Sequence, residues 1–281
     1  MGRRASARAP SAWGATRDAL AAVHNLVALL RSGSVLYRTI RDLLPELQTS
    51  AGALRETFAP YQDRLGMAQT SGSVAASRFE GAQGVDGAAG AAGAYGVAQV
   101  DELVRLLEAT ALADEERDAL ADRARRLADE LEATADLLAL LERAAHPAPT
   151  EVSVDVVVRG AARTSVSARG RQLPVRFDPP APECTVHADP HVLGPLLSLM
   201  IARLHAVGVQ AVVVRGRCDE KRATFEVRPA TAQDAIPETT THILPAVPPT
   251  DLVIGRVARD VGATLDLEDR RGRLELPRHV G

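Results

Sequence analysis

The first part of the chain shows apolar residues at helical spacing, from about Thr16 to Phe58. Residues three and four apart share one face of a helix, so this pattern predicts one or two amphipathic helices. Gly33 and Pro45 are the expected breaks, because glycine costs about 1 kcal/mol within a helix and a mid-helix proline removes a hydrogen bond. Residues 1–15 lack the pattern and are predicted to be disordered.

A second apolar stripe runs through residues 97–145 and predicts the clearest helix of the chain. Between the two patterns, residues of about 64–96 are rich in Gly, Ala, Ser and Gln, which is typical of a flexible linker. The two helical regions are expected to form a hairpin over residues 16–146. Because this hairpin is too thin to bury its apolar stripe alone, a second copy is expected to complete a four-helix bundle.

The periodicity changes after His146–Pro149, a segment that marks a domain boundary. Beyond it, alternating and β-branched runs predict strands, and longer apolar runs predict helices. Asp189 is placed to cap the helix that follows it, with Pro190 at the first helical position. The predicted fold class is α+β: the helical hairpin is followed at 150–281 by an α/β sandwich, a mixed sheet with helices on one face.

Composition adds limits on the class of protein. The 281 residues are 46% hydrophobic and 25% charged, enough for two ordinary domains. A net charge of −3 and an aromatic content of 3% give no basis for a nucleic-acid or membrane partner. The first residues match neither a signal peptide nor a membrane span, so a cytoplasmic protein is expected.

Cysteine and histidine residues predict neither a disulfide framework nor a metal site. Cys184 and Cys218 are the only cysteines and lack the paired spacing of a zinc site, so two reduced, partly buried thiols are expected. His187 and His191 lie four residues apart, but Pro190 intervenes and no third ligand is evident.

The order of predicted elements is similar to the core of sensor histidine kinases, and also to bacterial histidine phosphotransferases. Three stretches carry the resemblance: the end of the second helix at 136–141 running into 154–158, the segment 186–193 that resembles the start of the family's asparagine-box helix, and 257–265, which resembles its last helix and strand. The resemblance covers most of the chain outside the Gly/Ala linker. It implies a dimerisation and phosphotransfer hairpin, an ATPase-type domain, a homodimer and a response-regulator receiver domain as partner.

The nucleotide-binding motifs of that family are altered in this sequence. The box helix normally presents asparagines that hold the metal and phosphates, and the matching positions are Ser198 and Ala202, of which alanine has no metal-binding oxygen. The family's adenine-reading Asp is replaced by Arg228, and no glycine occurs between Gly216 and Gly255. Residues with a Cβ do not suit a phosphate-cradling loop. A degenerate ATPase site with no bound cofactor is predicted; Mg-ATP is the cofactor only if the chain is an active kinase.

His24 occupies the region where the family carries its phospho-accepting histidine. The family places an acidic residue next to that histidine as a general base, whereas this chain has Asn25, a change expected to slow autophosphorylation. Reception of a phosphoryl group from a response regulator needs only an exposed imidazole. The alternative interpretation is that His24 is an ordinary histidine of a helix surface or interface.

Three functional hypotheses stay open at this point. The first is a non-catalytic or phosphotransfer protein of two-component signalling, which docks a response regulator on its bundle. The second is a divergent but active sensor histidine kinase. The third is a structural interaction protein without phosphate chemistry.

Overall fold

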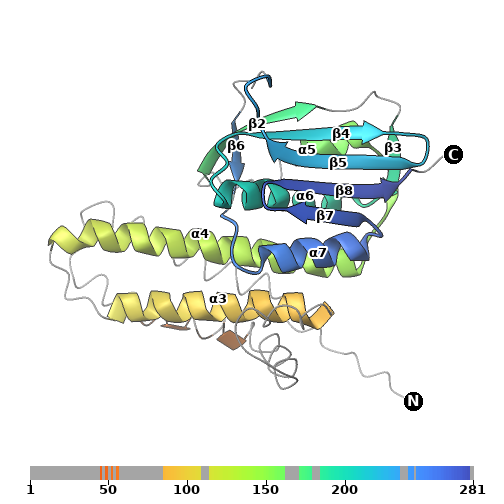
Figure 1. Cartoon of the computed structure of the whole chain (residues 1–281). Helices are drawn as coiled ribbons and strands as arrows, with labels where there is room; N and C mark the ends of the chain where they lie inside the picture. Colours follow the sequence, from red (N-terminus) through yellow and green to blue (C-terminus); the bar gives the residue numbers. More distant parts are fainter. Residues whose placement is uncertain are drawn as a thin grey trace, which may run out of the picture.

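Figure 1 shows the computed structural model of the chain, a helical hairpin lying against an α/β domain. The residues that it describes are six positions between Pro45 and Glu56, then 85–108, 114–161, 171–178, 184–234, 240–243 and 245–278. None of the helices within these ranges is long and apolar enough to cross a membrane.

The hairpin consists of α3 (Val85–Glu108) and α4 (Asp114–Ala145), which run antiparallel side by side (Figure 1). α3 therefore begins inside the segment expected to be a flexible linker, and residues 97–145 contain two helices rather than one. Alanine, the best helix former, accompanies the glycines there, and Ala88 and Ala92 are fully buried. Burial of these small side chains offsets the helix-breaking cost of glycine, which composition alone does not reveal.

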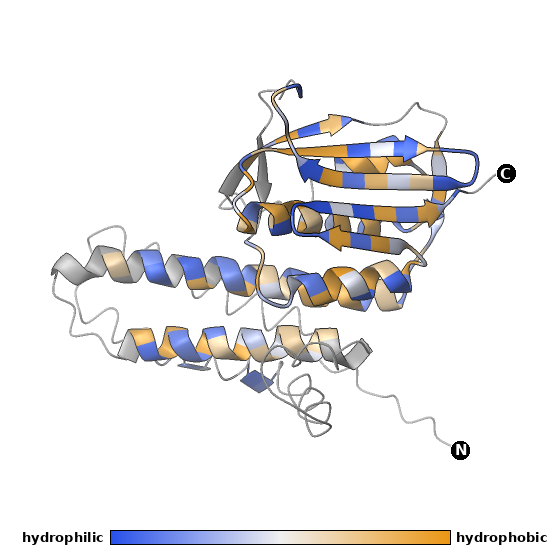
Figure 2. Cartoon of the chain, in the orientation of Figure 1, coloured by the Kyte–Doolittle hydropathy of each residue, from blue (hydrophilic) through white to orange (hydrophobic). Residues whose placement is uncertain are grey.

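The α/β domain contains a six-stranded mixed sheet in the order β6-β2-β4-β5-β8-β7. Only β2 and β4 pair in parallel; the other neighbours are antiparallel, including the two hairpins expected from the sequence. Figure 2 shows hydrophobic and hydrophilic residues alternating along these strands. One face of the sheet is therefore apolar and the other polar, as the α/β sandwich requires. The strands are β2 (Arg171–Asp178), β4 (Val212–Cys218), β5 (Arg222–Pro229), β6 (Thr240–Ile243), β7 (Thr264–Glu268) and β8 (Arg271–Pro277).

Three helices cover the apolar face: α5 (Val154–Gly160), α6 (Pro190–Ala206) and α7 (Thr250–Asp260). α6 is apolar on most sides and packs against β5, β6, α5, α7 and α4. Its cap is the one expected, because Asp189 Oδ1 accepts a hydrogen bond from the His191 N–H at 2.8 Å and Pro190 begins the helix. The expected α+β fold class is confirmed.

Asp189 also fixes the connection between the two halves. The chain leaves α4 at Ala145 and enters β1 (Thr150–Ser153), which pairs with β3 (Thr185–Ala188) in a separate two-stranded sheet. The other oxygen of Asp189 accepts a hydrogen bond of 3.0 Å from the Ala148 N–H in that connection. One buried carboxylate, 7% exposed, thus holds both the helix start and the segment joining the hairpin to the α/β domain.

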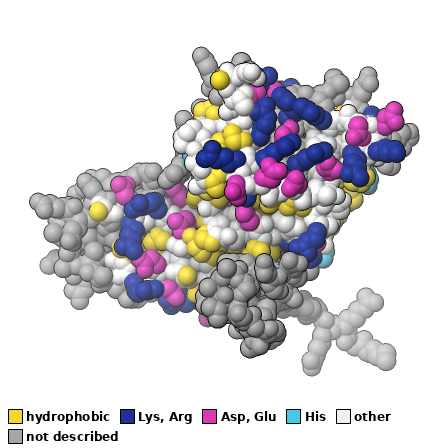
Figure 3. All heavy atoms as spheres, in the orientation of Figure 1, with side chains coloured by type: hydrophobic (Ala, Val, Ile, Leu, Met, Phe, Trp, Pro, Cys, Tyr) yellow, Lys and Arg dark blue, Asp and Glu magenta, His cyan; other side chains and the backbone are white. Residues whose placement is uncertain are grey.

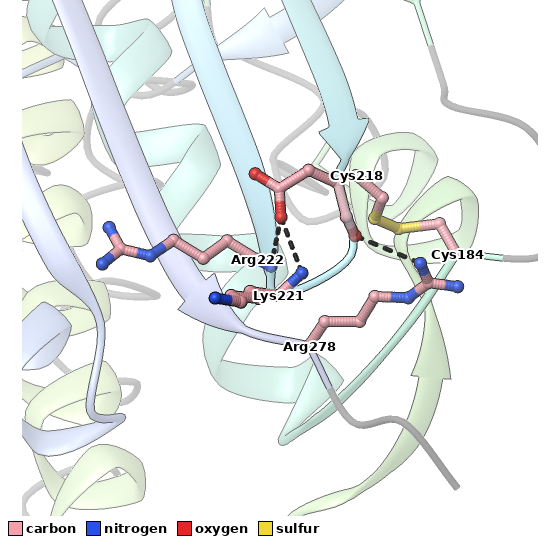
Figure 4. The surroundings of a disulfide bond; sticks show 6 residues. Cys184, Cys218, Lys221, Arg222 and Arg278 are labelled. Carbon is pink, nitrogen blue, oxygen red and sulfur yellow. Dashed lines mark hydrogen bonds between the residues drawn. A yellow bond between two sulfur atoms is a disulfide. The ribbon is translucent and has the colours of Figure 1, made fainter.

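Cys184 and Cys218 form a disulfide, with 6.1 Å between their Cα atoms (Figure 4). The expectation of two reduced thiols is wrong. The residues lie 34 apart in sequence and meet only because the tertiary fold places the end of β4 beside the start of β3, which local spacing does not encode. Arg278 lies next to the disulfide and donates from Nη1 to the Asp219 carbonyl at 3.1 Å.

We predict that breaking this disulfide lowers the free energy of unfolding by about 4 kcal/mol, because a cross-link of this loop length restricts the unfolded chain. Urea unfolding of Cys184→Ser, compared with the wild type with and without dithiothreitol, measures the loss. Equal midpoints for the oxidised wild type and the variant would contradict the prediction.

Candidate functional site

Helix α6 carries two of the three positions matched to the nucleotide site, Ser198 and Ala202, one turn apart. The helix sits at the centre of the α/β domain, with Leu193, Leu196 and Leu197 fully buried. What its few polar groups contact therefore decides whether a nucleotide could be held there.

The Ser198 hydroxyl is directed at the protein's own backbone. It donates to the carbonyl of Ala161, at the C-terminal end of α5, at 2.6 Å, and lies 3.1 Å from the carbonyl of Gly194 one turn earlier. A Cβ added at Gly194 would lie 3.7 Å from the Gly160 backbone, so the two helices approach closely here. Ser198 therefore joins α6 to α5. Ala202 is 4% exposed and offers only a methyl group.

Arg203, which the sequence did not single out, is a charged α6 side chain that contacts α7. Its Nε donates to Asp251 Oδ1 at 2.9 Å, and its Nη1 donates to the Glu268 carbonyl of β7 at 2.7 Å. Its side chain is only 13% exposed. The available signal was a single charge within an otherwise apolar helix. Arg203 thus links α6 to α7 and β7 through hydrogen bonds, and its guanidinium lies beside the first turn of α7.

Arg228 lies on the other face of the sheet from Ser198 and Ala202. Its strand neighbour Val227 is fully buried towards the helices, so Arg228 points away from them. Its guanidinium binds both oxygens of Asp234, at 2.8 and 3.0 Å. This guanidinium, with two hydrogen bonds from Thr231, lowers the pKa of Asp234 well below its usual range. Arg228 thus holds the loop after β5 through Asp234. The structure does not bring it near Ser198 and Ala202, the other two matched positions.

The residues at these positions do not fit a magnesium nucleotide. Magnesium takes oxygen ligands, and the one side-chain oxygen that α6 offers at the matched positions belongs to Ser198 and is engaged with the α5 backbone. Across the described ranges, no three His, Cys, Asp or Glu side chains gather as a metal-binding group. His24 and Asn25 lie outside the described residues, so their expected role stays a prediction.

A titratable group outside the predicted site lies in the hairpin. Burial, followed by the charge of Glu132 one turn away, raises the pKa of Asp136 to about 6, against the opposing effect of Arg143. On the facing helix, the Tyr95 hydroxyl donates to Glu130 at 2.6 Å, and burial together with that carboxylate raises the pKa of Tyr95. The α3–α4 contact thus contains polar groups that the apolar stripe did not predict.

The comparisons with known proteins point to one group of folds. No protein-family model and no curated protein sequence matches the chain. Among solved structures, it is similar to the Acinetobacter baumannii histidine kinase AdeS, at 10% identity and a TM-score of 0.38, over 64% of this chain and 92% of that one. The chain resembles histidine kinases. Full-length ShkA in complex with AMPPNP matches at 17% identity and a TM-score of 0.37, over 88% of this chain and 47% of that one.

A histidine kinase from Burkholderia phymatum STM815 matches at 15% identity and a TM-score of 0.32, over 66% of this chain and 94% of that one. The chain is thus similar to histidine kinases, at TM-scores below 0.5.

We predict that Arg203→Ala lowers the free energy of unfolding by about 2 kcal/mol, because a largely buried guanidinium loses two hydrogen bonds. Asp251→Asn is the matched control. Asp251 is 57% exposed and its loss leaves the bond to Glu268, so a change below about 1 kcal/mol is expected. Chemical unfolding measures both, and equal losses would show that Arg203 does not act through β7.

Asp136 makes stability depend on pH. Its folded pKa of about 6 lies above the usual pKa of 3.8 for this side chain, so its contribution to stability is complete below pH 4 and is lost as pH rises through 6. The total is up to about 3 kcal/mol. Asp136→Asn should be more stable than the wild type at pH 7 by an amount that vanishes near pH 4. Thermal unfolding across this range measures the difference, and a constant offset would contradict it.

Proposed function

We propose that this chain is a histidine-kinase-like protein of two-component signalling whose ATPase-type domain does not use nucleotide, and that it acts as a phosphotransfer or response-regulator-docking module. The observation that carries the proposal is the engagement of α6: Ser198 bonds the α5 backbone, and Arg203 bonds Asp251 and the β7 backbone. The polar groups of this helix hold the domain together, which leaves the hairpin as the part available for phosphate chemistry.

Packing supports a scaffold role for the α/β domain. α7 contacts both helices of the hairpin and α6 contacts α4, so the domain braces the hairpin along its side. Val253, Ile254 and Val257 of α7, which also packs against α6 and β7, are completely buried. A rigid support of this kind would hold a phospho-accepting histidine and a docked receiver domain in a fixed relation.

His24 is the proposed phospho-acceptor. An imidazole nitrogen would attack the acyl phosphate of a receiver domain, forming the N–P bond as the P–O bond to the receiver carboxylate breaks. This direction needs a neutral, exposed imidazole and no acidic neighbour, so Asn25 is compatible with it. Two copies of the chain are proposed to pair through the helical region; sedimentation as a monomer at micromolar concentration would contradict this pairing.

We expect a receiver domain phosphorylated with labelled acetyl phosphate to transfer label to the wild type and not to His24→Gln, because glutamine cannot form the phosphoramidate. His146→Gln is the matched control, since His146 is exposed at the end of α4 and should not affect transfer. Electrophoresis of the labelled chains measures the result.

Each outcome separates the hypotheses. Label that appears in both variants would exclude His24 as the phospho-acceptor. A panel of receiver domains that neither bind nor transfer label would favour the third hypothesis, a structural interaction protein without phosphate chemistry. Labelling of the wild type by ATP and magnesium alone would instead support the divergent active kinase.

A further inference from the structure

One face of α3 packs against α4, and the opposite face has a different neighbour. Tyr95 and Glu102 form side-chain hydrogen bonds with α4. Each residue of an α-helix is turned by about 100° from the residue before it. Val97 follows Tyr95 by two positions. Val100 precedes Glu102 by two, and Val104 follows it by two. These valines therefore lie on nearly the opposite side of α3, away from α4.

This opposite side of α3 is apolar and covered. Val97, Val100 and Val104 recur at spacings of three and four residues and are 8%, 2% and 9% exposed. By contrast, Figure 3 shows charged side chains of both signs on the surface of the hairpin that faces the viewer, as expected of helices in contact with solvent. Helix α7 also contacts α3, but in Figure 1 the yellow, C-terminal half of α3 extends beyond α7. A further part of the chain therefore covers these valines.

Arg55 connects this side of α3 to segment 45–56. Asp101 lies four residues after Val97 and three before Val104, so it shares their side of the helix. The Arg55 Nε donates to Asp101 Oδ1 at 2.6 Å. In Figure 1, the coloured positions of this segment lie on the side of α3 away from α4. We call this side the outer face of α3, formed by Val97, Val100, Asp101 and Val104.

The described positions of segment 45–56 lie along one side of a helix. They are 45, 48, 49, 52, 55 and 56, which recur at the three- and four-residue spacing of a helix face, and all but Gly52 are exposed. The sequence between and around them supplies apolar residues for the other side: Leu44, Leu47, Ala51, Leu54 and Phe58. Their spacing of three and four residues equals that of the valines on α3. Two helices with this repeat can interlock their side chains along a shared seam.

We infer that the outer face of α3 is the docking surface of the chain's own segment at about 44–58, which packs along α3 as a third helix. The four-helix bundle expected from the sequence would place a second copy on this face. In the single chain, however, the valines are already buried, and Arg55 of the same chain reaches the outer face. With this face occupied, a second copy or a receiver domain has to use another face of the helical region.

The valines, rather than the ion pair, are expected to hold the segment. Arg55 is 48% exposed and Asp101 is 37% exposed, and an ion pair at such exposure contributes little. Burial of apolar side chains is the larger effect. The pair fixes which residues meet, so both of its members can be replaced for a test without releasing the segment.

The test replaces the pair by cysteines, Arg55→Cys with Asp101→Cys, and joins them with a short thiol-reactive cross-linker. The two native cysteines are bound to each other and do not compete. Unlabelled and heavy-isotope-labelled chains are mixed in urea and refolded together, and the linked peptides are then weighed by mass spectrometry. Fewer than about one in ten linked pairs should join two chains, because positions held within one chain meet at an effective concentration on the order of millimolar.

Arg55→Cys with Glu142→Cys is the matched control. Glu142 is also a carboxylate and is exposed near the end of α4, far along the hairpin from Asp101. Its cysteine should cross-link to position 55 at least about tenfold less, because the linker cannot span that separation.

A second pair of variants tests the role of the valines. In the Arg55→Cys and Asp101→Cys background, Val104→Asp puts a charge on the outer face and should reduce the cross-link about tenfold. Ala98→Asp, at an exposed position of the same helix, should leave it unchanged.

Three results would each overturn the inference: linked pairs of which about half join two chains, as a second copy on this face would give, a yield no greater than that of the Glu142 control, or equal loss of the cross-link in the two aspartate variants. No phosphoryl group takes part, so the result does not depend on phosphotransfer through His24. A dimer whose cross-links all lie within single chains agrees both with this inference and with the pairing proposed for two copies.

Discussion

The packing of α6 is the constraint on which the rest of the structure depends. This helix contacts the sheet, α5 and α7 within its own domain, and α4 of the hairpin outside it. Its apolar residues form the centre of the core, and its polar ones form cross-links: Asp189 at its start holds the connection from α4, Ser198 holds α5, and Arg203 holds α7 and β7. A helix engaged on all sides stabilises the fold, and its polar groups are occupied by contacts within the protein.

The helical hairpin and the α/β domain, whose sequences differ in hydrophobic periodicity, are joined by these and neighbouring contacts. The connection at 146–149 is short, and it is fixed by the Ala148–Asp189 hydrogen bond and by the pairing of β1 with β3. The Cys184–Cys218 disulfide ties the start of β3 to the end of β4 and so attaches this small sheet to the large one. The position of the hairpin relative to the α/β domain therefore follows from a few identifiable contacts.

The local sequence pattern predicts the elements that depend on residues close together in the chain. The cap at Asp189, the apolar α6 and the hairpins β4–β5 and β7–β8 all follow from residues close in sequence. Other features depend on which strands become neighbours. Cys184 meets Cys218, and Arg203 meets Asp251, through the tertiary fold alone. The glycine-rich start of α3 resembles a linker in the sequence, because composition does not show the neighbours that bury its alanines.

For the candidate site, Ser198 and Ala202 lie together on α6 as expected. Arg228 lies on the other face of the sheet, because the side of β5 that it faces is set by the packing of the strand and not by its place in the sequence.

We propose that the protein's own contacts close α6 to a magnesium nucleotide. Isothermal titration of Mg-ATP into the chain measures whether it binds. No saturable heat is expected; a stoichiometric, magnesium-dependent isotherm, lost when Ser198 or Arg203 is replaced, would contradict the proposal.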